Sequence, residues 1–122
     1  MMLEKTIEIS LLFDFYSQLL TDRQREMIDL YYNQDFSLGE ISETFEISRQ
    51  AVYDTLKRTE KILYEYEEKL KLVKLFTSRS EKLQKTLETI LTLEDEIQKG
   101  STKEALMQPL DEIKELLTEM LN

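Results

Sequence analysis

The sequence contains no cysteine and no histidine, and it has only two glycines and one proline among 122 residues. Without cysteine it has no disulfide, thiolate metal site or cysteine nucleophile. Without histidine it has no imidazole base, no Ser-His-Asp triad and no zinc site of the usual kind. A glycine-rich phosphate loop is also missing. We therefore expect a protein that is not an enzyme and that holds no metal and no cofactor.

The shortage of glycine and proline also bears on the fold, because it leaves little turn material to connect many short strands. Leu, Ile, Glu and Lys dominate the chain, and these residues lose little side-chain freedom in a helix. Hydrophobic residues make up 41% of the sequence, which is enough to form a core. The composition therefore predicts an all-α protein.

Long apolar runs are absent as well. Charged residues such as Glu4, Lys5 and Asp14 interrupt any signal-peptide core near the start. No stretch approaches the ~20 apolar residues that span a bilayer. We expect a cytoplasmic protein with no membrane partner.

The overall charge opposes nucleic-acid binding. The chain has 16 basic and 25 acidic residues, for a net charge of −9. Since non-specific affinity for DNA comes mainly from neutralising phosphates, an acidic chain needs a local basic face to bind it.

Apolar spacing and capping residues predict six helices. The first covers about residues 5–20 and is apolar on more than one face. Thr21 with Gln24, and Ser37 with Glu40, have the spacing of capping boxes, and Ser48 is a third N-cap candidate. The inward residues of the second helix, which reaches about residue 34, are Met27, Ile28, Tyr31 and Tyr32. The two tyrosines could stack on bases, although burial in a small core is the commoner role.

A long helix is predicted from Ser48 to about Phe76, followed by a polar hinge over residues 77–80. Its apolar positions alternate in spacing between four and three residues: Val52, Leu56, Thr59, Leu63, Tyr66, Leu70 and Val73. Such a heptad stripe is more often ordinary core or a dimer seam than a ligand groove.

Two more helices follow the hinge. The first of them ends near Gly100, and Ser101 with Glu104 has the spacing of another capping box. Pro109 either starts the last helix or kinks it. These two helices and the long one present more apolar stripe than one chain of this size covers, so we expect a homodimer.

Residues 37–60 have the pattern of a helix-turn-helix. Ile41, Phe45, Ile47, Val52 and Leu56 would form the small core between its two helices. The second helix then presents its open side, where it could enter the major groove. The candidate nucleic-acid-binding residues are Ser48, Arg49, Gln50, Tyr53, Asp54, Lys57, Arg58 and Lys61.

These residue types suit the reading of a groove. Arg49 can give two hydrogen bonds to guanine, and Gln50 can pair with adenine in a similar way. Asp54 could accept from cytosine or orient Arg58, while Lys57, Arg58 and Lys61 suit phosphates. Residues 47–61 include four basic and two acidic residues, so the local charge is positive in an acidic chain.

The stretch from Leu20 to Leu63 resembles the helix-turn-helix of the fourth conserved region of bacterial sigma factors. The matching segments are L-T-D-R-Q-R-E, S-L-G-E-I-S-E and I-S-R-Q-A-V. The longer string S-R-Q-A-V-Y-D-T-L-K-R-T-E-K-I-L, with the size of the chain and its helical tail, resembles the YlxM family. The proteins of that family are small bacterial proteins encoded beside signal recognition particle genes.

The resemblance implies a sigma-factor-like helix-turn-helix bundle over residues 1–76, with a long recognition helix, and a C-terminal helical hairpin over residues 77–122. It implies base contacts by Arg49, Gln50 and Asp54 and a phosphate contact by Arg58. It also implies a DNA-binding regulator that takes part in the signal recognition particle pathway. The alternatives are docking on the RNA or protein components of that particle without reading DNA, or an adaptor that uses only its helical tail.

The sequence departs from the sigma pattern in one respect. Glu46 stands in the turn where that pattern has glycine. A left-handed backbone there costs a residue with a Cβ about 1 kcal/mol more than glycine, so we expect some distortion of the turn.

Overall fold

A computed structural model of the chain describes residues 2–122, with side chains from residue 3 onward. These residues form six α-helices and no strand, which confirms the predicted all-α fold. The α-helices are α1 (Met2–Tyr16), α2 (Asp22–Ile28), α3 (Leu38–Phe45), α4 (Arg49–Leu70), α5 (Leu72–Gln98) and α6 (Lys103–Leu121). The 3-10 turn η1 (Ser17–Leu19) follows α1, and the π-helical turn η2 (Asp29–Asn33) continues α2. The chain divides into two compact units, one up to Val73 and the other from Lys74 onward.

Side-chain caps start the helices of the first unit where the sequence predicts them. The Thr21 hydroxyl accepts the Gln24 N–H at 3.2 Å, and the Gln24 side chain accepts the Thr21 N–H at 3.0 Å. Ser37 and Glu40 form the same reciprocal pair at the start of α3. The Ser48 hydroxyl accepts the Ala51 N–H at 3.0 Å at the start of α4. The two capping boxes and the third N-cap are therefore confirmed.

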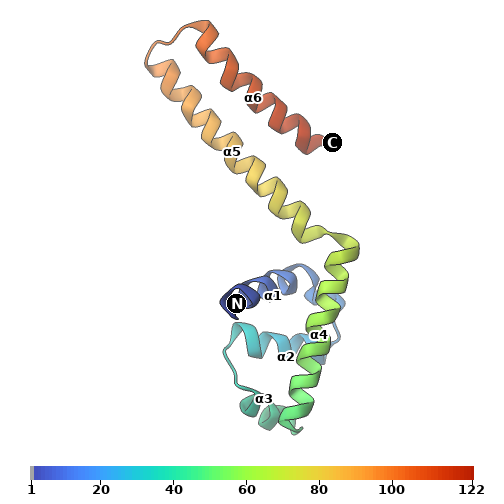
Figure 1. The fold of residues 1–122 in the computed structure, drawn as a ribbon. Coiled ribbons are helices and arrows are strands. Elements are labelled where there is room, and N and C mark those ends of the chain that lie inside the picture. The colour runs from blue at the N-terminus through green and yellow to red at the C-terminus, as the bar shows by residue number, and fades with distance from the viewer. Residues whose placement is uncertain (1) are drawn as a thin grey trace. The chain divides into compact units, whose positions relative to one another are not determined.

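The core of the first unit lies along one face of α4, which packs against α1, α2 and α3 (Figure 1). Its buried residues are Ile9, Leu12, Tyr16, Leu20, Met27, Ile28, Ile41, Val52, Leu56 and Leu63. Phe45 and Ile47 pack against this core while remaining partly exposed. Thr59 is also buried, so the first four positions of the predicted heptad stripe belong to ordinary core.

The helix that starts at Ser48 ends earlier than predicted. It stops at Leu70, and Lys71 adopts a left-handed conformation with φ 55° and ψ 30°. The new helix α5 begins at once and runs through residues 77–80, so the predicted hinge there is wrong. Residues 77–80 are therefore interior residues of α5.

The physical reason for the early break is a polar pair formed by buried Tyr16 and partly buried Glu67. The Tyr16 hydroxyl donates to the Glu67 carboxylate and accepts the N–H of Leu72 at 3.1 Å. The same carboxylate accepts the N–H of Val73 at 3.0 Å. The first N–H groups of a helix have no partner within the helix, so these two acceptors stabilise a helix start at this point. Burial, followed by the bond to Glu67, raises the pKa of Tyr16.

The second unit is a hairpin of α5 and α6 (Figure 1). Gly100, with φ 74°, follows the end of α5 as predicted, and the N–H of Ser101 bonds to the Glu96 carbonyl at 3.1 Å. The predicted N-cap at Ser101 is wrong by one residue, because Thr102 accepts the Ala105 N–H and the Ser101 hydroxyl bonds to Glu96.

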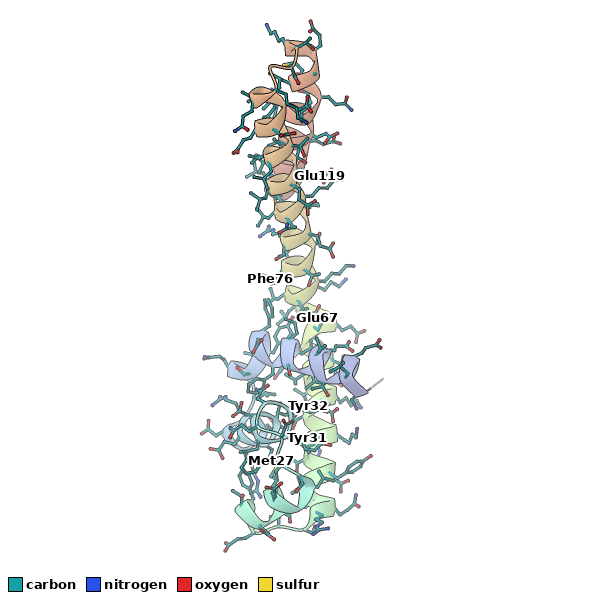
Figure 2. The ribbon with its side chains drawn as sticks, turned by 90° about the vertical axis from the view of Figure 1, so that its left-hand side faces the viewer. Met27, Tyr31, Tyr32, Glu67, Phe76 and Glu119 are labelled. Carbon is teal, nitrogen blue, oxygen red and sulfur yellow. The ribbon has the colours of Figure 1, made fainter. Side chains whose placement is uncertain are left out.

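Pro109 lies inside α6, which begins six residues earlier at Lys103. The last helix therefore does not start at Pro109, one of the two predicted alternatives. A proline at this position removes the N–H that would bond to the Ala105 carbonyl. An ion pair of Lys82 with Glu119, at 3.4 Å, joins the two helices of the hairpin, and Figure 2 labels Glu119.

Among the described residues, no helix combines the length and the apolar character that crossing a membrane requires.

The backbone at Glu46 gives a direct test of the turn before α4. Glu46 adopts φ 56° and ψ 45°, a conformation that glycine takes without the strain of a Cβ. We expect Glu46→Gly to raise the free energy of unfolding by about 1 kcal/mol, measured by urea denaturation. Glu46→Ala is the matched control, since it removes the carboxylate and keeps the Cβ. An equal gain in both variants would assign the effect to the charge and contradict the strain.

Candidate nucleic-acid interface

The helix-turn-helix geometry is kept despite the glutamate in its turn. Glu46 takes the left-handed conformation that glycine would take, and the N–H of Ile47 bonds to the Ser42 carbonyl at 3.1 Å. This bond closes the end of α3 in the manner of a glycine-terminated helix. Ser48 then caps α4. The expected distortion of the turn is therefore not found.

All eight candidate residues come from residues 49–61 of α4 and its N-cap Ser48. Since α4 buries the side that carries Val52, Leu56 and Leu63, these residues are left on its exposed side. The exposed residues are Ser48, Arg49, Gln50, Tyr53, Asp54, Lys57, Arg58 and Lys61. The structure thus brings the whole predicted set together on one face, which we call the α4 face.

The base-reading candidates on the first turn of α4 are held in place by neighbours. An ideal Cβ built on Gly39 would lie 3.1 Å from the nearest atom of the Arg49 guanidinium. The side chain of Arg49 therefore lies close against the backbone of α3, where a larger residue would push it away. The Gln50 amide donates to Asp54 at 2.9 Å, one turn further along α4. Asp54 thus orients Gln50, whereas the sequence suggested Arg58 as its partner.

Lys57 differs from the other basic residues of the face. Its ammonium lies 3.7 Å from Glu60 Oε2 and 5.5 Å from the centroid of the Tyr53 ring. The neighbouring Lys5 side chain, and then burial, lower the pKa of Lys57. Arg58 and Lys61 extend from the exposed surface of α4, so they are the simplest candidates for phosphate contacts.

Glu60 is a buried carboxylate directly behind the α4 face, with 5% of its surface exposed. Its Oε1 atom accepts the Tyr32 hydroxyl at 2.7 Å and lies 3.0 Å from the Lys5 ammonium. Burial, followed by the bond to Glu60, raises the pKa of Tyr32 strongly. One carboxylate therefore joins α1, η2 and α4.

Sequence reasoning did not single out Gly39, Glu60 or Lys5 for roles at the site. Gly39 carried a signal, because glycine inside a helix costs about 1 kcal/mol relative to alanine and often marks close packing. Glu60 also carried a signal, because it stands four residues after Leu56 and three before Leu63. This helical spacing places its charged side chain on the same side as two residues predicted to be buried. Lys5 carried no local signal, since its partner is far along the chain.

Acidic side chains flank the α4 face. Glu40 and Glu43 on α3, and Glu46 in the turn, are all exposed. The Arg23 guanidinium of α2 lies over the Phe45 ring of α3, 5.5 Å from its centroid. Among the described residues of this site, those on α4 and the neighbouring Lys5 supply its positive charge.

Comparison with known proteins gives a consistent result. Residues 3–104 match the sequence model of the UPF0122 family, described as "Putative helix-turn-helix protein, YlxM / p13 like". A UPF0122 protein of Halalkalibacterium halodurans is 52% identical, with 92% of this chain and 96% of that protein covered. UPF0122 protein YlxM of Bacillus subtilis is 57% identical over 72% of this chain and 80% of its own length. A Listeria welshimeri relative is 47% identical, and the match covers 94% of this chain and 99% of that protein. The chain therefore belongs to the UPF0122 family.

Proposed function

We propose that this protein is a cytoplasmic, non-enzymatic regulator that binds duplex DNA through the α4 face of a sigma-factor-like helix-turn-helix. The observation that carries the proposal is the position of the eight candidate residues on the exposed side of one helix, directly after a three-residue turn. A helix presented in this way can enter the major groove with its first turns foremost.

The electrostatics of the proposed interface restrict how it binds. The long-range field of a chain with a net charge of −9 repels phosphates. At physiological salt this field is screened beyond about 8 Å, so Arg49, Arg58 and Lys61 act only at close range. Binding should therefore be weak without base contacts and should decline steeply as salt rises.

A second candidate function is docking on the RNA or protein of the signal recognition particle. The observation that favours it is the row of exposed carboxylates at Glu40, Glu43 and Glu46. These carboxylates repel the phosphates of a long duplex that runs across α3. They repel a partner that touches only α4 much less. A gel-shift comparison of duplex DNA with signal recognition particle RNA, at low and physiological salt, separates the two candidates.

The binding proposal predicts different effects for two arginines of the α4 face. Arg49→Ala should weaken binding to a preferred duplex by about 1–3 kcal/mol and relax the preference at one base position. Arg58→Ala should weaken binding to all duplexes alike and reduce the slope of log affinity against log salt by about 1. Fluorescence anisotropy over a panel of duplexes measures both effects.

Lys103→Ala is the control for these variants, because it removes one exposed charge from the second unit. Its affinity for DNA should equal that of the wild type. Wild-type protein that binds neither DNA nor RNA at low salt would refute the proposed function, and equal losses in Arg49→Ala and Lys103→Ala would refute the assigned role of Arg49.

We also propose that the protein is a homodimer joined through its second unit. In this unit Ile113 is buried to 8% exposure, whereas Leu83, Leu87 and Leu117 are exposed by 55%, 50% and 44%. Several large apolar side chains exposed on one small unit seldom stay uncovered in a monomer. A second copy of the same hairpin would cover it.

Light scattering at micromolar concentration tests the dimer. We expect a mass of twice the 14.6 kDa of one chain. Replacing Leu83 and Leu87 together by glutamate should return the mass to that of one chain, because the charges would be buried at the interface. A wild-type mass of 14.6 kDa would contradict the proposal.

A further inference from the structure

A cavity of about 240 Å³ opens beside α4, next to the α4 face. Its volume lies below the roughly 300–1,000 Å³ of pockets that hold whole drug-sized ligands. Its size therefore suits one small group rather than a larger molecule. The lining residues that bear on its chemistry are Lys5, Tyr31, Tyr32, Tyr53, Lys57 and Glu60.

Tyrosine rings form the walls of this cavity. Tyr31 and Tyr32 meet edge to face, with centroids 5.0 Å apart and planes at 84°, and Figure 2 shows both beside α4. Tyr53 also lines the cavity and keeps 45% of its surface exposed. Exposed aromatic faces stack on nucleobases, and each stacked base contributes about 1–3 kcal/mol.

The carboxylate of Glu60 provides an acceptor in the cavity. Its Oε1 atom already receives Tyr32 and Lys5, whereas Oε2 lies 3.7 Å from the Lys57 ammonium, which is longer than a hydrogen bond. An ionised carboxyl group has about four lone-pair sites, so Oε2 can accept hydrogen bonds from a ligand.

Two ammonium groups give the cavity its positive charge. The side chains of Lys5 and Lys57 are 45% and 46% exposed, so both can also reach a charged group outside. The proximity of Lys5 lowers the pKa of Lys57, and an anion placed between them would relieve their repulsion. The two lysines disfavour a simple cation, and Glu60 disfavours a simple anion. A suitable ligand has N–H donors at one end and a negative charge at the other.

We infer that this cavity binds one unpaired guanine nucleotide of a strand held on the α4 face. Guanine is planar and has two adjacent N–H donors on its Watson–Crick edge that can converge on the two lone pairs of Glu60 Oε2, while its phosphate meets Lys5 and Lys57. Adenine would place an acceptor against the same carboxylate. Tyr53 and Lys57 belong to both the α4 face and the cavity lining. A strand bound on the α4 face can therefore place a looped-out base in the cavity.

The inference rests on the proposed nucleic-acid binding and adds a selectivity that duplex binding alone does not require. The experiment compares three DNA hairpins that share one stem: one with a bulged deoxyguanosine, one with a bulged deoxyadenosine and one without a bulge. We expect wild-type protein to bind the first about tenfold more tightly than the third, with the second closer to the third.

Two variants locate the preference. Tyr53→Leu should bind all three hairpins alike, because it removes an aromatic wall that is exposed and outside the core. Lys61→Ala, on the same helix but outside the cavity, should weaken all three equally and keep the tenfold preference. Circular dichroism checks that both variants are folded.

The outcomes separate this inference from the proposed function. Binding of all three hairpins with equal affinity by the wild type would overturn the inference and leave nucleic-acid binding intact, as would a preference that survives Tyr53→Leu. Absence of binding to any hairpin or duplex would overturn both. Binding of guanosine monophosphate alone, lost in Tyr53→Leu, would support the chemistry of the cavity and identify a free nucleotide as its source.

Discussion

The buried carboxylate of Glu60 is the constraint on which both the fold of the first unit and its candidate site depend. A charge with 5% exposure must be paired and hydrogen-bonded, because an unpaired buried charge strongly destabilises a protein. Its donors come from separate parts of the chain, Tyr32 in η2 and Lys5 in α1, while Lys57 lies near it on α4. The partners that satisfy Glu60 therefore bring α1 and η2 against α4, directly behind the α4 face.

The same arrangement explains why α4 can serve as both core and surface. One face of α4 packs against α1, α2 and α3, and the residues of the α4 face remain exposed. At the far end, Tyr16 and Glu67 satisfy the first N–H groups of α5 and end α4 at Leu70. The α4 face is thus carried by a helix fixed at both ends within the first unit.

Much of this unit could be predicted because its signals are local. The caps at Thr21, Ser37 and Ser48 are recognisable from residues three positions apart, and buried positions such as Ile41 and Val52 follow from helical spacing. The exposure of the candidate residues follows from the same spacing, since they are what remains once the core is removed.

The features that sequence analysis missed depend on partners far apart in the chain. The break at Lys71 depends on Tyr16, which lies 55 positions earlier in the chain. Lys71 itself is not a usual helix breaker. The role of Lys57 changes because α1 brings Lys5 beside it. Local patterns determine which residues can cap or pack, whereas long-range hydrogen bonds determine where a continuous helical pattern is interrupted.

The most direct test of the central claim is a nuclear magnetic resonance titration of ¹⁵N-labelled protein with duplex DNA at low salt. If the α4 face binds nucleic acid, the largest amide shifts should fall between Ser48 and Lys61. The amides of α6 should move little. Shifts concentrated in the second unit, or spread evenly over the chain, would contradict the claim that α4 is the binding surface.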